Sequence, residues 1–257
     1  MKSPVGRIMK ILVALLLVTA AGEASAFAQP SSVMIWPIHP VVRAGEKATA
    51  LWLENRGAAP VTLQIRVVGW EQTDFDDEYR ERPDGLIASP PMATIEPGRR
   101  QLVRLTRLTE PPAARELAYR VLVDELPPVN RAAAVPAANQ AAMGVTFRMR
   151  YSLPLFVHGP GLESPSASAN ASVSWRIVSD GPMRWLEVRN DGTTHVRLTN
   201  TRMFTADSGF DLAPGLLGYV LGHSTMRWRL PDSAPAGEGV TLETRINGAL
   251  VLPVSHD

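Results

Sequence analysis

The sequence predicts an all-β protein made of two sandwich domains, and three observations carry that prediction. Short runs rich in β-branched and aromatic residues follow one another, each bounded by Gly, Pro, Asn or Asp. No stretch of about ten or more residues shows the apolar periodicity of an amphipathic helix. A faint internal repeat links the two halves. Short strands with frequent turns are typical of a sandwich or a barrel.

The expected strands fall into two groups. Those of the first part are Ala48–Leu53, Val61–Trp70, Gln101–Thr106, Leu117–Val123 and Met143–Val157. Those of the second part are Val173–Val178, Trp185–Arg189, His195–Phe204, Thr225–Leu230 and Val240–Ile246. Between the groups, Val157–Ala169 is rich in Gly, Pro and Ser and lacks periodicity, which predicts a domain boundary there.

The internal repeat consists of two similar strand-turn-strand patterns. In both, an alternating strand ends at Asn-x-Gly, where a turn is cheap because both residues tolerate positive φ, and an alternating strand resumes. This predicts one hairpin in each of two sandwiches, with generic hairpin chemistry as the alternative. The first copy is Leu51, Leu53, Asn55, Gly57, Val61 and Leu63, and the second is Leu186, Val188, Asn190, Gly192, Val196 and Leu198.

The N-terminus predicts an export signal. A basic start precedes the apolar run Ile11–Ala21, which is too short to span a bilayer, and small residues follow. We expect a signal peptide over residues 1–26, or 1–28, cleaved after Ala26 or Ala28. The mature protein is expected to be exported and soluble, with no membrane insertion after cleavage. The basic residues of the signal are Lys2, Arg7 and Lys10.

The charge balance argues against nucleic acid or an anionic lipid as a partner. The chain has 26 basic and 25 acidic residues, and processing leaves it close to neutral. It has no cysteine, so an exported protein of this size must rely on its core instead of disulfides. Lys47 is the only lysine after the signal, so any further fixed cation must be an arginine.

The sequence predicts no enzyme, no cofactor and no metal site. There is no phosphate-binding loop, and Gly222-His223-Ser224 lacks the closing glycine of a nucleophile elbow. The acidic run Asp74–Glu78 lacks the spacing of a calcium loop and is expected to be a solvated loop. The histidines are too scattered to predict a ligand set. They are His39, His158, His195, His223 and His256.

Three blocks of sequence carry a resemblance to a known family. Ile87–Leu105 joins a Ser-Pro-Pro turn to a Glu-Pro-Gly turn before a Gln-x-x-Arg strand, Tyr119–Pro128 ends in Leu-Pro-Pro before a long loop, and Leu153–Pro160 closes the pattern. In this order they resemble the N-terminal domain of the periplasmic chaperones of the chaperone-usher pilus pathway, over most of residues 33–160. Trp70-Glu71-Gln72 ahead of the acidic run is similar to the archaic (alternative) branch.

The resemblance implies two immunoglobulin-like β-sandwich domains in a boomerang arrangement, with no enzymatic activity. We expect an N-terminal domain over 31–157 with a donor strand, a linker over 158–168 and a C-terminal domain over 169–257. Such a chaperone would bind pilus, fimbrial or spore-coat-type subunits in the periplasm by lending a strand, and deliver them to an outer-membrane usher. The alternatives are a secreted structural or adhesive pilus subunit, and an exported hydrolase.

The segment Met143–Met149 alternates with period two. Four apolar side chains, those of Met143, Val145, Phe147 and Met149, fall on one face of the expected strand, and arginines fall on the other. The resemblance implies that the apolar four are donated to a groove in the subunit. The alternative is that they face the core of the chain itself.

The resemblance also implies a basic site for the subunit's C-terminal carboxylate in the cleft between the domains. The candidates are Arg104, at the Gln-x-x-Arg position, Arg148 and Arg150, each of which could instead make an ordinary ion pair. The first-strand basic residue of the family corresponds to His39 or Arg43 without a clean alignment.

The interdomain ion-pair set of the classical members is altered here. Glu116 matches one of its members, but His158 replaces the linker arginine, and the neighbourhood of Asn247 and Gly248 replaces the aspartate of the second domain. The domain angle must therefore be held in another way, or held less firmly.

Overall fold

The computed structural model describes residues 33–127, 148–162, 172–206, 208–235, 237, 239–251 and 254–255. The expected signal peptide and the expected donor residues Met143, Val145 and Phe147 lie outside these ranges. Of the expected linker, the structure describes the part up to Leu162.

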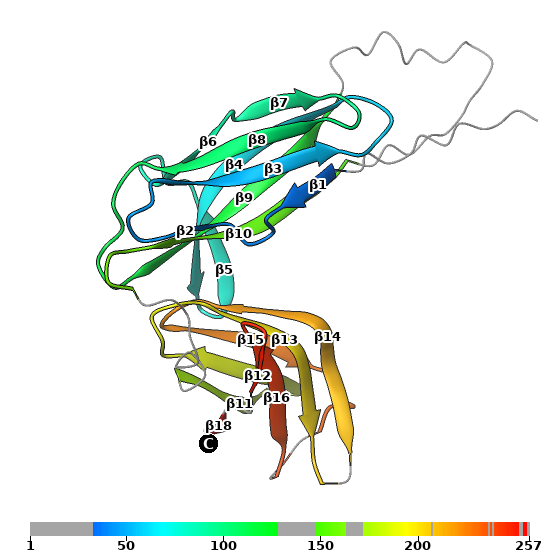
Figure 1. Cartoon of the computed structure of the whole chain (residues 1–257). Coiled ribbons are helices and arrows are strands. Elements are labelled where there is room, and N and C mark those ends of the chain that lie inside the picture. Colours follow the sequence, from blue (N-terminus) through cyan, green and yellow to red (C-terminus); the bar gives the residue numbers. More distant parts are fainter. Residues whose placement is uncertain are drawn as a thin grey trace, which may run out of the picture.

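The described residues form two β-sandwiches, set at an angle to each other (Figure 1). The first part of the chain contributes the strands β1 (Val33–Trp36), β2 (Val41–Val42), β3 (Ala48–Asn55), β4 (Val61–Thr73), β5 (Asp76–Arg80), β6 (Leu86–Ser89), β7 (Met92–Ile95), β8 (Arg100–Arg107), β9 (Glu116–Leu126) and β10 (Arg150–His158). The second part contributes β11 (Val173–Asp180), β12 (Met183–Asn190), β13 (Val196–Phe204), β14 (Gly209–Val220), β15 (Ser224–Leu230), β16 (Thr241–Ile246), β17 (Ala249–Val251) and β18 (Val254–Ser255).

Each sandwich consists of two sheets. In the first, the order β1-β3-β8-β6 faces the order β2-β10-β9-β4-β5, with β7 pairing to β4. In the second, β15-β12-β11-β18 faces β14-β13-β16-β17. The fold-class prediction of two immunoglobulin-like sandwiches in a bent arrangement is confirmed, and the barrel alternative is not.

Alternating apolar residues build a separate core in each sandwich. Leu51 and Leu53 of β3 and Val121 of β9 are fully buried in the first core, and Leu186 and Val196 occupy the second. A third, smaller apolar cluster lies where the two sandwiches meet, and it positions the candidate site described below.

The repeat does not form hairpins, so this part of the sequence prediction is wrong. β3 and β4 lie in different sheets of the first sandwich, and β12 and β13 lie in different sheets of the second. The Asn-x-Gly turn therefore carries the chain from one sheet to the other. Sheet membership depends on pairing with distant strands, which a local turn signal does not encode.

A buried asparagine stabilises each of these turns from one sheet to the other. Asn55 donates to the carbonyl oxygens of Ala59 and Ile95, both at 2.8 Å, and accepts from the N–H of Gly57 at 2.8 Å. Asn190 repeats the pattern in the second sandwich. Its side chain donates to the carbonyls of Thr194, Val220 and Leu221 and accepts from the N–H of Gly192.

Replacing either asparagine by alanine should destabilise its own sandwich. Asn55→Ala removes hydrogen bonds to two carbonyls and one N–H next to the core, and Asn190→Ala removes those to three carbonyls and one N–H, so each change should cost on the order of 2–3 kcal/mol. Chemical denaturation measures the cost, with Ser179→Ala at an exposed position of β11 as the control. Loss of less than about 0.5 kcal/mol in both variants would show that the turns between the sheets do not depend on these side chains.

Candidate functional site

The candidate site is the cleft between the two sandwiches, and aromatic packing forms its floor. Trp70 of β4, Phe156 of β10, Tyr219 of β14 and Leu221 make one buried cluster that includes residues of both sandwiches. The rings of Trp70 and Tyr219 meet edge to face, with centroids 5.6 Å apart. This contact fixes one side of the second sandwich against the outer face of β4 and β10.

A buried carboxylate joins the sandwiches next to this cluster. Glu116, at the start of β9, is only 3% exposed in its side chain. One carboxylate oxygen lies 3.2 Å from Nε2 of His158, and the other lies 2.9 Å from Nδ1 of His195. The backbone N–H of His195 donates to Glu116 at 2.7 Å. We call Glu116, His158 and His195 the Glu116 cluster.

The hydrogen bonds of the cluster keep the carboxylate ionised. Burial by itself raises the pKa of Glu116, but hydrogen bonds from His158 and His195 outweigh it and lower the pKa to about 2. His195 also stacks on Phe156, with ring centroids 3.4 Å apart. The cluster replaces the altered ion-pair set, and Asn247 serves elsewhere, since its Oδ1 accepts from the N–H of Arg197 at 2.9 Å.

The hairpin of β4 and β5 makes a second connection. Gln72 donates to the carbonyl of Tyr219 at 3.0 Å and accepts from the N–H of Leu221 at 2.8 Å, so it pairs with the backbone of the second sandwich. Asp77 accepts from Trp70 at 2.8 Å and from Gln72 at 2.9 Å. Asp76 to Glu78 therefore belong to strand β5, and the expectation of a loop is wrong for them, whereas Asp74 lies in the exposed turn before the strand.

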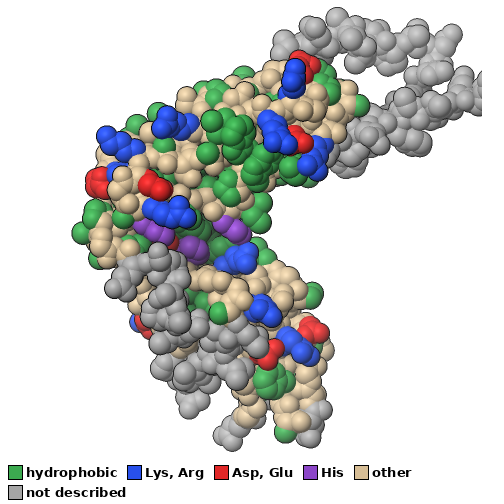
Figure 2. Space-filling model, in the orientation of Figure 1, with side chains coloured by type: hydrophobic (Ala, Val, Ile, Leu, Met, Phe, Trp, Pro, Cys, Tyr) green, Lys and Arg blue, Asp and Glu red, His purple; other side chains and the backbone are tan. Residues whose placement is uncertain are grey.

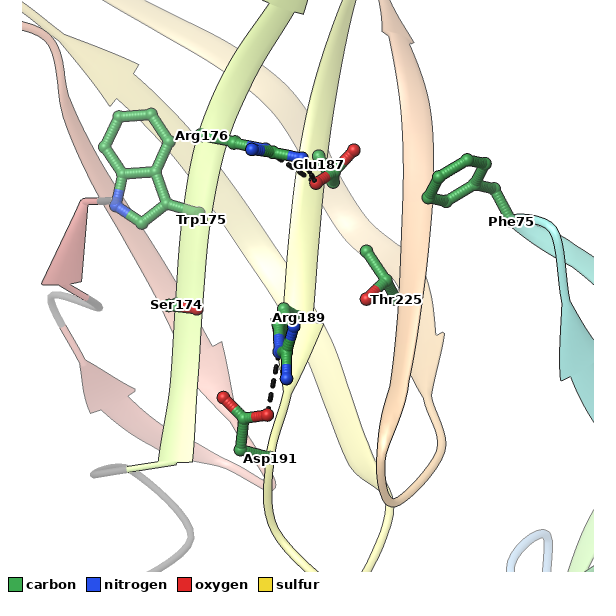
Figure 3. Close-up of a pocket in the computed structure, with 8 residues that line it drawn as sticks. All are labelled: Phe75, Ser174, Trp175, Arg176, Glu187, Arg189, Asp191 and Thr225. Carbon is green, nitrogen blue, oxygen red and sulfur yellow. Dashed lines mark hydrogen bonds and ion pairs between the residues drawn. The ribbon is translucent and has the colours of Figure 1, made fainter. Parts of the chain in front are cut away.

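The tip of this hairpin reaches the second sandwich. Phe75 forms a β-bridge with Met226, and the guanidinium carbon of Arg227 lies 3.7 Å from the centre of its ring. Figure 3 shows Phe75 approaching the face of β12 and β15 across a cavity of about 450 Å³. The charged side chains of that cavity pair with one another, through Glu187 with Arg176 and through Arg189 with Asp191. The four charged side chains of this cavity are therefore paired with one another. The contacts of Phe75 with this face support the hairpin against the second sandwich.

The cleft itself is basic. Arg120 of β9 lies 3.8 Å over the ring of Trp70 and 5.7 Å from the ring centre of Tyr219. Arg197 of β13 contacts Nε2 of His39 at 3.1 Å, and Nδ1 of His39 lies 3.2 Å from the hydroxyl of Tyr219. Figure 2 shows histidines gathered where the sandwiches meet, with basic side chains on both sides.

The two arginines of the cleft have no carboxylate partner. Within the described parts of the chain, no salt bridge involves Arg120 or Arg197. Burial, assisted by the charge of Arg197 and by His195, lowers the pKa of His39. The arrangement is suited to an anion that enters from outside the chain.

One edge of β10 is open along most of its length. β10 pairs with β9 from Arg150 to His158, whereas β2 covers its other edge only at Phe156 and Val157. The N–H of Phe156 bonds to Pro40 on that side, so by alternation the backbone groups of Arg150, Ser152 and Pro154 also point there. Within the described residues nothing pairs with them.

The structure does not bring the three predicted carboxylate-binding arginines together. Arg104 is exposed on β8, on the outer face of the other sheet, next to Ala50 and Leu102. Arg148 and Arg150 are exposed at the start of β10, whereas the cleft lies at its end, about 25 Å further along the strand. Arg150 pairs with Asp124, which also binds Arg66 at 2.9 Å.

The cleft residues were partly missed from sequence. His39 was one of two alternatives for the first-strand position, and the other, Arg43, is exposed and bonds to Glu46. Arg120 lies within a block that carries the resemblance, but its place follows from its pairing opposite Pro154. Arg197 has no local signal, since only the packing of the two sandwiches brings it to the cleft.

No group of three or more histidine, aspartate or glutamate side chains in the described ranges is arranged to hold a metal ion. The same ranges contain no helix that is long and apolar enough to cross a membrane.

The fold and the cleft define a two-sandwich protein with an open strand edge that leads to a basic interdomain cleft. Residues 33–163 match the family described as pili and flagellar-assembly chaperone, PapD N-terminal domain. This match covers half of the sequence, so the chain belongs to that chaperone family.

Comparison with individual proteins agrees. The chain is 28% identical over 178 residues to the chaperone protein FimB/FhaD of Bordetella pertussis, covering 65% of this chain and 66% of that one. It is 28% identical over 176 residues to the probable fimbrial chaperone YadV of Escherichia coli K12, covering 67% and 64%. The match thus spans about two thirds of the length of these curated relatives.

Solved structures extend the likeness to both sandwiches. A chain of the CsuC-CsuE chaperone-tip adhesion subunit complex, from the archaic chaperone-usher Csu pili of Acinetobacter baumannii, is similar with a TM-score of 0.69 and 30% identity. The similarity covers 88% of this chain and 100% of that one. The YadV chaperone shares the fold with a TM-score of 0.62 at 16% identity over 86% and 96%.

Glu116→Gln should weaken the two-sandwich structure in a pH-dependent way. Because the folded state lowers the pKa from 4.5 to about 2, ionised Glu116 stabilises the fold above about pH 4.5, and this contribution is lost as the pH falls toward 2. The shift corresponds to about 3 kcal/mol. Denaturation at several pH values should show wild type and variant converging as the pH falls below 4.5. A constant difference, or an equal effect of Glu81→Gln at an exposed position, would contradict this role.

Proposed function

We propose that the protein is a periplasmic chaperone of the archaic branch that binds pilus or fimbrial subunits by donor-strand complementation and delivers them to an outer-membrane usher. The observation that carries the proposal is the open edge of β10 running into a basic cleft. Family membership and the likeness to a chaperone from archaic pili support it. Spore-coat-type subunits are a further class of client that the same edge would suit.

The open edge supplies the main-chain part of the interaction. A partner strand lying beside β10 would meet the N–H groups of Arg150 and Ser152 and the carbonyls of Arg150, Ser152 and Pro154. Pro154 has no N–H, so the ladder of donors ends at Ser152. Beyond that point the partner chain depends on the cleft.

The donated side chains supply the apolar part. Met149, the described member of the set, is 46% exposed and by alternation shares a face with Tyr151 and Leu153, which pack on the first core. It is the position at which this face leaves the core. We propose that Met143, Val145 and Phe147 continue the same face into the subunit, at roughly 1.5–3 kcal/mol for each buried side chain before ordering costs.

The cleft would hold the subunit's C-terminal carboxylate. We assign this role in the first sandwich to Arg120, with His39 as a positioning residue beside it, instead of Arg104, Arg148 and Arg150, because Arg120 lies at the cleft end of β10 and lacks a carboxylate partner in the described structure. A strand that ends in the cleft must run parallel to β10. A carboxylate fixed there sets the register, which decides whether donated side chains point into the groove.

The closed core of each sandwich favours a chaperone over the alternative of a pilus subunit. A subunit would need its own groove to be filled, whereas each half of this chain already contains two facing sheets around a closed core. We propose the domain division 31–157, 158–168 and 169–257 for the same protein, with export by the N-terminal signal.

Ser152→Pro should reduce subunit binding and leave the chaperone folded. Proline removes the N–H on the open edge and keeps the ladder to β9, because the groups of Ser152 point away from β9. Co-purification with a fimbrial subunit from the same genome should fall at least about tenfold, as expected for one lost hydrogen bond and local mismatch.

The matched control for this change is Ala50→Pro, at an exposed position on the sheet that does not contain β10, because the N–H of Ala50 likewise points away from its paired strand, β8. It tests whether a proline in any strand lowers recovery, with the folded fraction of both variants measured by thermal unfolding. Full subunit recovery with folded Ser152→Pro would rule out pairing along this edge.

Arg120→Gln should weaken subunit binding, whereas Arg104→Gln should not. Glutamine keeps much of the packing over Trp70 but cannot hold a carboxylate with a charged, two-pronged donor. Subunit recovery measures both variants. Strong loss with Arg104→Gln and none with Arg120→Gln would place the carboxylate on the other sheet and reject the assignment to the cleft.

A further inference from the structure

The cleft has a cationic wall on each sandwich. Arg120 and His39 belong to the first sandwich, and Arg197 and Tyr219 belong to the second, from the adjacent strands β13 and β14. The other three lie around Tyr219, since Arg120 is 5.7 Å from the centre of its ring, His39 contacts its hydroxyl, and Arg197 contacts His39.

The hydrogen-bond roles in this group follow from what each atom can donate. A guanidinium only donates, so Nε2 of His39 must accept the bond from Arg197. Neutral His39 then carries its proton on Nδ1 and donates it to the oxygen of Tyr219. The lowered pKa of His39 agrees with the neutral form.

The hydroxyl proton of Tyr219 is left available. Its oxygen already accepts from His39, and the residue is only 6% exposed. Burial raises the pKa of Tyr219, so the hydroxyl keeps its proton at neutral pH. Within the described residues no carboxylate or carbonyl is recorded as its acceptor. A buried donor therefore stands beside two arginines without carboxylate partners, which is the environment that a carboxylate requires.

We propose that Arg197 and Tyr219 of the second sandwich bind the subunit's terminal carboxylate together with Arg120 of the first, while neutral His39 orients Arg197 and Tyr219, so that subunit binding locks the angle between the two sandwiches. This inference rests on the proposed function. A ligand held from both walls favours only those arrangements in which the walls face each other, and it shifts the population of interdomain angles by its differential affinity.

The polar contacts between the sandwiches make such locking useful. The Glu116 cluster and Gln72 connect the sandwiches mainly through hydrogen bonds, and the apolar cluster between them is small. Interfaces of this kind allow relative motion of domains by default. A bridging carboxylate adds a contact that exists only in the loaded chaperone.

Two spin labels measure the angle directly, because the chain has no native cysteine. Met92→Cys on β7 and Ser179→Cys on β11 are exposed positions on different sandwiches. The probe is an acetylated peptide of alternating valine and threonine with a free C-terminal carboxylate, and its comparison is the same peptide with a C-terminal amide. Affinity and the distribution of label distances are measured for the full chain.

In the wild type, the carboxylate peptide should bind more tightly than the amide and narrow the distance distribution. Arg197→Gln should weaken binding of the carboxylate peptide at least about tenfold and abolish the narrowing, with little effect on the amide. Arg197→Lys, which keeps the charge, should retain part of both effects. Arg202→Gln, on the same strand and paired with Asp211 outside the cleft, is the matched control and should behave as wild type.

The other outcomes separate the two proposals. If the wild type prefers the carboxylate and Arg197→Gln keeps both affinity and narrowing, the inference is overturned and the proposed function stands. If Arg202→Gln loses as much as Arg197→Gln, the effect is general charge and the inference is also overturned. If wild type fails to bind the peptide or to distinguish carboxylate from amide, the carboxylate site is overturned, and the inference with it.

Discussion

One buried carboxylate determines the arrangement on which the site depends. Glu116 begins β9 in the first sandwich and takes hydrogen bonds from His158, at the end of β10, and from His195, just before β13. It therefore connects the strand that carries Arg120, the strand with the open edge and the strand that carries Arg197. If this contact were lost, the two walls of the cleft would be held only by the aromatic cluster and by the hairpin of β4 and β5.

A buried charge of this kind is costly unless every lone pair has a partner, and here the partners are histidines. His195 satisfies one oxygen through both its ring and its backbone, and its ring also stacks on Phe156. The same residue thus contributes a polar and an apolar contact between the sandwiches. Gln72 is likewise fully paired across the interface. Its side-chain amide donates to one backbone group of the second sandwich and accepts from another.

Local sequence patterns predicted the strands well and the site only in part. Alternation identified nearly every long strand because the core faces of both sandwiches require it. The alternation pattern did not identify β14, because Pro214 and Gly215 interrupt the middle of this strand. There the structure shows irregular pairing with β13. The Asn-x-Gly turns were recognised, but a turn signal cannot tell whether the next strand joins the same sheet or the facing one.

The cleft could not be predicted because its members meet only through long-range packing. Arg104 stood out by its motif, yet β8 directs it away from the sheet that holds β10. Arg120 and Arg197 are distant in sequence, and they approach the same tyrosine only after both sandwiches have folded and docked. The departures noted around Glu116 and His158 were the local signal that something other than an arginine-aspartate pair holds the domains.

Pro154 marks the point along β10 at which main-chain hydrogen-bond donors end and the charged cleft begins. Opposite Arg120, proline keeps its place in the strand because its missing N–H faces the open edge and not β9. A partner chain therefore finds main-chain donors as far as Ser152 and a cationic group beyond it. Hydrogen bonds along the edge would suit any strand, whereas in the proposed function the cleft favours a chain that ends there with a negative charge. Under the proposed function, selection for a terminus, and with it the register of the whole strand, would follow from that single change of chemistry along β10.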